Sequence, residues 1–577
     1  MENLFAGDFA EKYISLYSGE IRLTLPGRKG RLVSLRLLPG EKEFPAMLWK
    51  ALEERNLGAT LFLAPEKLEK YNAGSFRNNI CIAPDLRSYG TLSSDGLNSI
   101  RERFGKVTGS FCRGIMLNGS AAEEMHEILQ QNSFLYCVDP SCTHSAAVSL
   151  DFLTMKNSSI NGDIPEEILE RFLKSDPYGG VFAHFSLLLT GDLTDEILQK
   201  KVLPLLDRLN SEEIFFTRDE EYCQYHSALR SLRISLDSSM AENVSFLPLY
   251  LVANGRKLVL DPGEKLYVNR KDSAPAFDPW GRSFAEEDYE YEIRRPAEME
   301  IPEREVAGFP DGTVFFPGGC RKALSFSYDD GNMKDADLIR ILDKYGMKGT
   351  FNLNAHRVLT GIKTSGETWG KQYKGHEVAG HGFFHYSFAS QAPSGNLALL
   401  YGDRAVLEKC FGEILCCHDY ANGTFSGAVA DARRNLAACG YIYARGAGNT
   451  MGFELPEDFL LWEQTCHHNK GILALADKFI EADEKESLKA FTVWGHVSEL
   501  VRDNAFDMMD EFCKKLYGKE KYIWYATNKE ICEYVLASRK LLWMEDRSAV
   551  KNLSHMSLLI ACKGKLISLA PGGILHF

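Results

Sequence analysis

The stretch Ala323-Leu324-Ser325-Phe326-Ser327-Tyr328-Asp329-Asp330-Gly331 decides the fold of the second half of this sequence. It begins as a largely apolar run, and a helical pattern follows it over residues 334–345. A buried strand that leads into an amphipathic helix is the repeating unit of a parallel α/β sheet. The two carboxylates at the end of this strand are candidates for a metal ligand and for a base that acts on a water molecule.

A histidine motif follows later, Gly375-His376-Glu377-Val378-Ala379-Gly380-His381-Gly382-Phe383-Phe384-His385. His381 and His385 are four residues apart, so one helical turn would put both imidazoles on one face. Together with Asp330 they would supply three protein ligands, and a catalytic metal site leaves its other positions open. Asp329 would then be the general base, because a base should not also bind the metal. Either motif alone is a weak signal, but the two together indicate a mononuclear metal hydrolase.

Length and charge limit the other classes of function. A chain of 577 residues is too long for one hydrophobic core, so roughly two to four domains are expected. The net charge of −13 argues against a nucleic-acid partner, which needs a basic surface. No basic segment followed by an apolar segment, as in a secretion signal, is visible at the start of the sequence. The sequence also contains no run of ~18 apolar residues, the length of a membrane span. We therefore expect a cytoplasmic, bacterial protein with no membrane partner.

The sequence contains an internal repeat. At one constant separation along the sequence, Tyr225 matches Tyr534 and Gly263 matches Gly572. Residues 182–263 align with residues 491–572 without a gap. Residues 59–63 match residues 349–353 at a shorter separation, so the second copy carries extra residues in its middle. The repeat predicts two related domains in one chain.

Alternating strand and helix patterns in the second copy predict parallel βα units, hence an α/β barrel or a doubly wound sheet. The expected strands are residues 323–328, 349–353 and 491–494, and the expected helices are residues 334–345, 404–416, 428–439, 506–516 and 529–541. Short alternating strands around a glycine turn close each copy and predict a small antiparallel β module. The expected order is a first barrel-like domain at 20–235, a β module at 240–266, a connector at 267–315, a second domain at 316–545 and a β module at 546–577.

With the two motifs and the late Trp494-Gly495-His496, the sequence resembles the polysaccharide deacetylase family with its NodB-homology domain. The resemblance runs from Ala323 to about Ala537. It implies a distorted (β/α) barrel of NodB type that removes acetyl groups from N-acetylated, or O-acetylated, carbohydrates. It also implies one divalent metal, most often Zn²⁺, with Co, Ni or Mn as alternatives.

The resemblance assigns roles to individual residues. Asp330, His381 and His385 would bind the metal, and Asp329 would be the general base. His496 matches the late histidine of the family and would protonate the leaving amine, which is a poor leaving group without a proton. Further candidates for substrate contact, oxyanion binding or support are Asn422, Tyr420, Arg445, Trp494, Glu499, Tyr386 and His467.

One motif departs from the family pattern. The family usually has an Arg-x-Pro-Tyr-Gly motif or a Tyr-Pro-Tyr-Gly variant, where this sequence has Asp419-Tyr420-Ala421-Asn422-Gly423-Thr424. A backbone N–H at Asn422 could still stabilise an oxyanion, since a backbone donor survives a change of side chain. The arginine is missing, and Arg445 is a candidate substitute partner for Asp329, with an ordinary surface arginine as the alternative.

The first copy lacks the catalytic residues. In the gapless register His496 falls on Leu187 and Glu499 on Thr190, and the Asp-Asp-Gly turn falls on Leu38-Pro39-Gly40. His381 and His385 fall near Pro84 and Ser88. We therefore expect a first barrel that folds but does not catalyse.

Two other functions stay open at this point. The nearest is a metal-dependent amidase acting on a non-sugar amide or a cyclic imide, and the second is a carbohydrate-binding protein with no activity. The sequence does not fix the sugar, the choice between N- and O-deacetylation, the metal that is bound, the role of the first copy or the oligomeric state.

Overall fold

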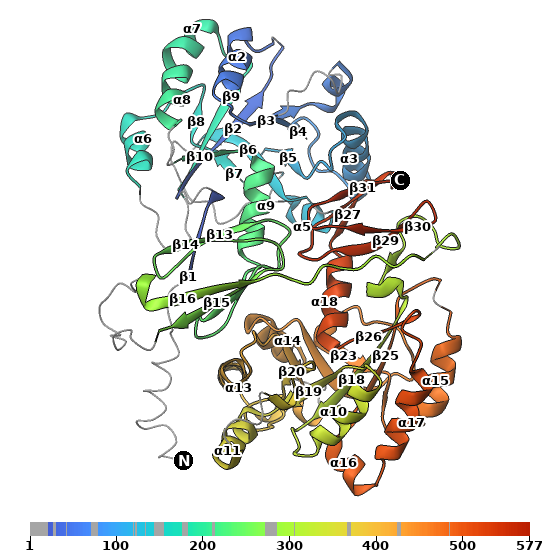
Figure 1. The fold of residues 1–577 in the computed structure, drawn as a ribbon. Helices are drawn as coiled ribbons and strands as arrows, with labels where there is room; N and C mark the ends of the chain where they lie inside the picture. The colour runs from blue at the N-terminus through green and yellow to red at the C-terminus, as the bar shows by residue number, and fades with distance from the viewer. Residues whose placement is uncertain are drawn as a thin grey trace.

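The computed structural model describes residues 21–26, 30–41, 43–70, 79–118, 121, 124–132, 134–142, 155–175, 183–210, 214–271, 286–304, 306–365, 371–423, 429–483 and 485–577. Each half of the chain contains parallel strands surrounded by helices and two small antiparallel sheets. Figure 1 shows the parallel strands of the first half at the top, those of the second half at the bottom and the antiparallel sheets between them.

The second half is built around strand β18 (Lys322–Asp329), in which every residue is buried. β18 pairs in parallel with β25 along its whole length, with β19 at its carboxyl end and with β26 at its amino end. Residues 462–467 pair with β22 through β23 and with β25 through β24, so this one stretch closes the sheet. The expected distorted barrel of parallel strands is therefore present in this half.

The other strands of this barrel are β19 (Gly349–Leu353), β20 (Glu377–Gly380), β21 (Cys417–Asp419), β22 (Tyr443–Asn449), β23 (Trp462–Gln464), β24 (Cys466–His467), β25 (Lys489–His496) and β26 (Ile523–Tyr525). Its helices are α10 (Asp335–Lys344), α11 (Ala355–Ser365), α13 (Pro393–Phe411), α14 (Val429–Ala438), α15 (Ile472–Glu481), α16 (Val497–Arg502), α17 (Phe506–Leu516) and α18 (Asn528–Ser538). The expected strand at 349–353 and helix at 506–516 have the predicted bounds. The expected helix at 404–416 was misplaced, because it begins at Pro393 and ends where Gly412 takes a left-handed φ of 67°. Residue 428, where another helix was expected to begin, lies outside the described residues.

The parallel strands of the first half follow a similar order but form two sheets. β2 (Arg31–Leu38) pairs with β9, β3 and β10, and residues 155–160 lead from β6 to β9 through β7 and β8. A single bridge between Asp85 and Met116 connects β4 to β5. The remaining strands are β3 (Ala59–Leu63), β4 (Ile80–Pro84), β5 (Gly114–Met116), β6 (Tyr136–Cys142), β7 (Met155–Asn157), β8 (Ser159–Ile160), β9 (Ala183–Thr190) and β10 (Ile214–Thr217), and the helices are α2 (Ala46–Glu54), α3 (Ser94–Thr108), α5 (His126–Gln131), α6 (Glu166–Leu173), α7 (Asp195–Ile197), α8 (Leu203–Leu209) and α9 (Asp219–Leu229).

Strand pairing fixes which positions of the two halves correspond. Leu38 pairs with Thr190 as Asp329 pairs with His496, so Thr190 is the counterpart of His496. The expected counterpart, Leu187, was wrong, and so was the match of Glu499 to Thr190. The chain between β25 and β26 is longer than the chain between β9 and β10, so a gapless match cannot hold upstream of β10.

The antiparallel sheets are larger than expected. Module 1 comprises β1 (Ile21–Thr24) with β13 (Leu249–Ala253) and β14 (Arg256–Leu260), and β11 (Arg233–Ile234) with β12 (Met240–Glu242), β15 (Lys265–Arg270) and β16 (Tyr289–Arg294). Module 2 comprises β17 (Val314–Phe315) with β29 (Leu558–Cys562) and β30 (Lys565–Leu569), and β27 (Leu541–Trp543) with β28 (Ala549–Asn552) and β31 (Ile574–His576).

The expected module boundaries at 240–266 and 546–577 were therefore too narrow. Residues 267–315 are not a plain connector, because they include β16 and β17 and most of β15. Residues 272–285 of that connector, and residue 20 at the expected start of the first domain, lie outside the described residues. Among the described residues, no helix combines the length and apolar character that a membrane crossing requires.

One tyrosine ties each barrel to its own module in the same way. The hydroxyl of Tyr225 donates to the carbonyl of Thr24 and accepts from the N–H of Tyr250. The hydroxyl of Tyr534 donates to the carbonyl of Phe315 over 2.6 Å and accepts from the N–H of Leu559 over 2.9 Å. Each hydroxyl therefore joins a helix to two strands of a module.

We expect Tyr534→Phe and Tyr225→Phe each to lower the free energy of unfolding of their own half by about 2 kcal/mol, because each leaves one buried carbonyl and one N–H without its partner. Urea unfolding followed by tryptophan fluorescence and by hydrogen exchange measures the loss and assigns it to a half. A loss below roughly 0.5 kcal/mol in both variants contradicts the expectation.

Candidate active site

The two carboxylates leave the end of β18 in different directions. Asp329 is the last residue of the strand, and 4% of its side chain is exposed. Asp330 follows with a φ of 77°, a left-handed conformation that is rare for a residue other than glycine. Such strain is kept where the surrounding structure fixes it, and it is common at functional sites. The turn places Asp330 at the mouth of the barrel and leaves Asp329 inside it.

His381 and His385 lie on a loop after β20, which we call the ligand loop (residues 381–387). The expected helical turn was wrong, because Gly382 and His385 take φ values of 77° and 61°. The two rings nevertheless meet, with centroids 4.8 Å apart. Asp403 of α13 holds the loop, since its Oδ2 accepts from the N–H of Gly382 and its Oδ1 from the N–H of Ala355.

Three side chains converge at the mouth of the barrel. Oδ1 of Asp330 lies 3.8 Å from Nε2 of His381 and 3.5 Å from Nε2 of His385. Oδ1 of Asp330 and Nε2 of His381 are buried and have no hydrogen-bond partner among the described residues. Buried polar atoms are rarely left unpaired, and together with His385 these two residues form a group that could hold a metal ion. One carboxylate and two imidazoles suit a divalent transition metal such as zinc.

Asp419 orients the first of these imidazoles. Its Oδ2 lies 2.7 Å from Nδ1 of His381, so Nδ1 keeps its proton and Nε2 is the nitrogen that would bind a metal after losing its own proton. Burial disfavours the charged ring, but Asp419 outweighs it and raises the pKa of His381 to about 9. Sequence reasoning did not single out Asp419. Its position at the end of β21, next to the ends of other parallel strands, was the available signal.

Arg445 lies against the proposed base. Its guanidinium contacts Oδ1 of Asp329 through Nη2, and its Nε lies 2.9 Å from Oδ1 of Asp419. Asn352 donates to the same Oδ1 of Asp329 over 2.7 Å. Burial opposes ionisation of Asp329, but Arg445 and the nearby histidines outweigh it and lower the pKa of this carboxyl. Trp494 packs against the guanidinium, whose carbon is 4.8 Å from the ring centroid.

His496 faces Asp329 from the end of β25. Its Nε2 lies 3.8 Å from Oδ2 of Asp329, beyond hydrogen-bonding distance. Its Nδ1 lies 3.3 Å from Oε2 of Glu499, and that oxygen also lies 2.9 Å from Nε2 of His467. Glu499 therefore fixes the ring of His496 with Nε2 on the side of Asp329. His468, which was not among the candidates, stacks on Tyr328 beside this group at a centroid distance of 5.8 Å.

The remaining candidates divide between the mouth and the core. Tyr386 follows His385, and 51% of it is exposed, so its ring is available to a ligand. Asn422 is exposed beside the ligand loop, and its Nδ2 donates to the carbonyl of His385 over 3.4 Å. Tyr420 is buried, and its hydroxyl donates to the carbonyl of Leu460, so it packs inside the domain and supports the turn.

Residues 318–443 match the family model described as polysaccharide deacetylase. No curated protein matches the chain at a significant level. Similar solved structures include a putative polysaccharide deacetylase from Mycobacterium smegmatis, with 18% identity over 42% of this chain and 96% of that one and a TM-score of 0.29. A family 4 acetyl xylan esterase from Clostridium thermocellum, in complex with a cobalt ion, shares 16% identity over 37% of this chain and 91% of that one, with a TM-score of 0.26. Peptidoglycan deacetylase PdaC from Bacillus subtilis shares 16% identity over 38% of this chain and 93% of that one, with a TM-score of 0.27.

The match confirms the family resemblance for the part of the chain that holds the candidate base and all three candidate ligands. Residues 318–443 thus form a polysaccharide deacetylase family domain, in which Asp329, Asp330, His381 and His385 all lie.

Proposed function

We propose that the second half of this chain is a metal-dependent hydrolase that removes acetyl groups from an N-acetylated, or O-acetylated, carbohydrate. The observation that carries the proposal is the pair of buried, unpartnered atoms, Oδ1 of Asp330 and Nε2 of His381, which face one another next to His385. The family match of residues 318–443 supports the same class of substrate.

Asp330, His381 and His385 would hold the divalent cation, most often Zn²⁺. When bound, such a cation lowers the pKa of water and polarises a carbonyl. Asp329 would take the proton from the attacking water through Oδ2, because its Oδ1 is occupied by Asn352 and Arg445. The lowered pKa of Asp329 keeps it ionised and ready to accept that proton.

His496 would give a proton to the leaving nitrogen from Nε2, while Glu499 holds its Nδ1. The C–N bond then breaks and yields acetate and a free amine. The exposed rings of Tyr386 and Phe384 border the ligand loop and would contact the sugar. The backbone of Asn422 is the candidate oxyanion donor.

We also propose that the first half is a degenerate copy of this domain without catalytic function. Its strand order is similar, but the positions of Asp330, His381 and His496 hold Pro39, Asp85 and Thr190. Proline offers no ligand atom in its side chain. Inside this barrel, Arg36 and Asp219 form a fully buried ion pair, so packing groups occupy the interior.

A metal-dependent amidase acting on a non-sugar amide or a cyclic imide would use the same groups, and a carbohydrate-binding protein would need none of them. Incubation with N-acetylglucosamine oligomers and with cyclic imides, followed by acetate and amine assays, separates the three functions.

Metal removal should strongly reduce acetate release. We expect dialysis against a chelator, or Asp330→Ala, to lower kcat/KM by roughly 10³-fold, equal to about 4 kcal/mol of transition-state stabilisation. Added Zn²⁺ or Co²⁺ should restore the dialysed protein but not the variant. Asp85→Ala, at the first-half position that corresponds to His381, is the matched control and should keep full activity. Undiminished acetate release from Asp330→Ala would end the proposal.

Loss of Arg445 should shift the acidic limb of the pH profile of kcat/KM to higher pH. A carboxyl with a lowered pKa stays ionised to low pH, and Arg445→Met removes the main group that lowers the pKa of Asp329 while its burial remains. The kcat/KM of the variant should therefore begin to fall at a higher pH than that of the wild type. Arg445→Lys, which keeps the charge, should shift the limb less. An unchanged limb in Arg445→Met would show that Asp329 is not the base.

Glu499→Gln should lower kcat most for substrates whose leaving group needs a proton. We expect about a 10–100-fold fall in kcat for an N-acetyl sugar, because His496 loses its orienting carboxylate. For 4-nitrophenyl acetate, whose leaving group needs no proton, kcat should change little. His496→Ala should give the same selective loss, and equal losses on both substrates would contradict the role of this pair.

A further inference from the structure

We propose that the first half functions as a permanently attached, non-catalytic subunit that holds helix α13 and, through α13, keeps the ligand loop in its metal-binding conformation. The inference rests on the proposed metal site. It assigns a function to the half of the chain that has no catalytic residues.

Helix α13 contacts the ligand loop through a buried side chain. Asp403 is fully buried, and its two oxygens accept from the N–H groups of Ala355 and Gly382 over 2.9 and 3.1 Å. Gly382 lies between the two histidine ligands in sequence. The loop is not helical and has left-handed residues, so these fixed hydrogen bonds determine where His381 and His385 lie.

The next residues of the same helix bind the first half. Arg404 donates through Nη2 to the carbonyl of Ile234 over 2.7 Å, and Oε2 of Glu408 accepts from the N–H of Leu236 over 2.8 Å. Arg404 and Glu408 also pair with each other over 2.7 Å, and both are buried. A single helix therefore holds a turn of module 1 on one side and the ligand loop on the other.

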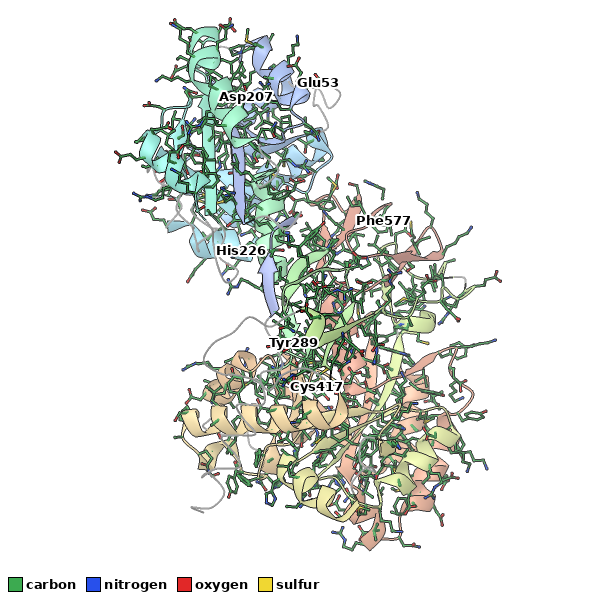
Figure 2. All side chains as sticks on the ribbon, turned by 60° about the vertical axis from the view of Figure 1, so that its left-hand side comes forward. Glu53, Asp207, His226, Tyr289, Cys417 and Phe577 are labelled. Atoms are coloured by element: carbon green, nitrogen blue, oxygen red, sulfur yellow. The ribbon has the colours of Figure 1, made fainter. Side chains whose placement is uncertain are left out.

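Other contacts surround this junction. Met240 and Tyr267 of module 1 form an apolar cluster with Ile414, which follows α13. Lys265 pairs with Glu413 over 2.8 Å. In Figure 1 strands β15 and β16 lie above α13 and α14, and in Figure 2 Tyr289 and Cys417 mark the level where the halves meet. The contact is thus on the side of the second barrel away from the mouth.

The other barrel is held in the same way, which gives an internal control. Arg101 of α3 donates to the carbonyl of Asn132, as Arg404 donates to that of Cys439, and it pairs with Glu545 of module 2 over 3.2 Å. Gly263 approaches the carbonyl of His555, and the matching Gly572 approaches Phe246. Each half therefore offers the other the same surface, as in a twofold-symmetric dimer. Only one of the two helices holds a ligand loop.

The turn in module 1 permits a precise test. The N–H of Ser238 donates to the carbonyl of Ser235, which puts Leu236 at the second position of a β-turn, where proline is favoured. Leu236→Pro therefore deletes the N–H that Glu408 accepts while the turn persists. In module 2 the N–H of Arg547 donates to the carbonyl of Met544, so Glu545→Pro is the matched control.

The experiment measures Co²⁺ binding to the full chain by visible absorption. Leu236→Pro should raise the Kd for Co²⁺ about 10-fold and lower kcat in parallel, since altered support of ligands costs about 10–100-fold in metal affinity. Glu545→Pro should leave that Kd within about twofold of the wild type, although both variants lose a comparable amount of Tm. A second pair, Arg404→Met and Arg101→Met, should show the same contrast and replaces the first pair if a proline variant does not fold.

The possible failures can be told apart. If the wild type binds no Co²⁺, the proposed metal site is wrong, and this inference falls with it. If the wild type binds Co²⁺ and the two variants of a pair retain equal affinity, the metal site stands and the function assigned to the first half is overturned. If Asp403→Asn leaves the Kd unchanged, α13 does not hold the ligand loop, which also overturns the inference.

Discussion

A row of alternating buried charges organises the site. Asp329 of β18, Arg445 of β22, Asp419 of β21 and His381 after β20 follow one another in contact. β20, β21 and β22 are neighbouring strands, and Arg445 reaches from β22 to β18 on another side of the barrel. Each charge is stabilised by its neighbours, and removal of one leaves a buried charge uncompensated at a cost of about 3–5 kcal/mol. This row sets the ionisation of the proposed base and the tautomer of a proposed ligand together.

The barrel makes that row possible. Parallel strands bring their carboxyl ends to one side, so residues from β18, β20, β21, β22 and β25 meet although they are far apart in sequence. The stretch at residues 462–467 closes the barrel and also supplies His467 to Glu499. In the first half, parallel strands follow a similar order, and Arg36 of β2 forms a buried pair with Asp219 of α9, so this arrangement does not depend on the candidate catalytic residues.

Pattern reasoning predicted the main strands of the second half well, because strands depend on local signals. The strand that ends at Asp329 and the strand at 349–353 are buried along their whole length. Such strands are expected when both faces of a parallel sheet are covered. The helical turn for His381 and His385 was wrong, because four-residue spacing is equally compatible with a loop when Gly382 and His385 adopt left-handed φ values. The match of Leu187 to His496 was wrong because few identical residues fix the register before β10, whereas hydrogen bonding between strands fixes it directly.

The sequence by itself determined the parallel strands of the second half and the set of carboxylates and histidines that could bind a metal. Only the tertiary structure decided that Arg445 pairs with Asp329, that Asp419 orients His381, and that Trp494 packs on Arg445 and Tyr420 supports a turn. It also decided that α13 lies between the ligand loop and the first half. The physical reason is that apolar periodicity reports which face of an element is buried, while the partner of a buried charge depends on which strands become neighbours when the barrel closes.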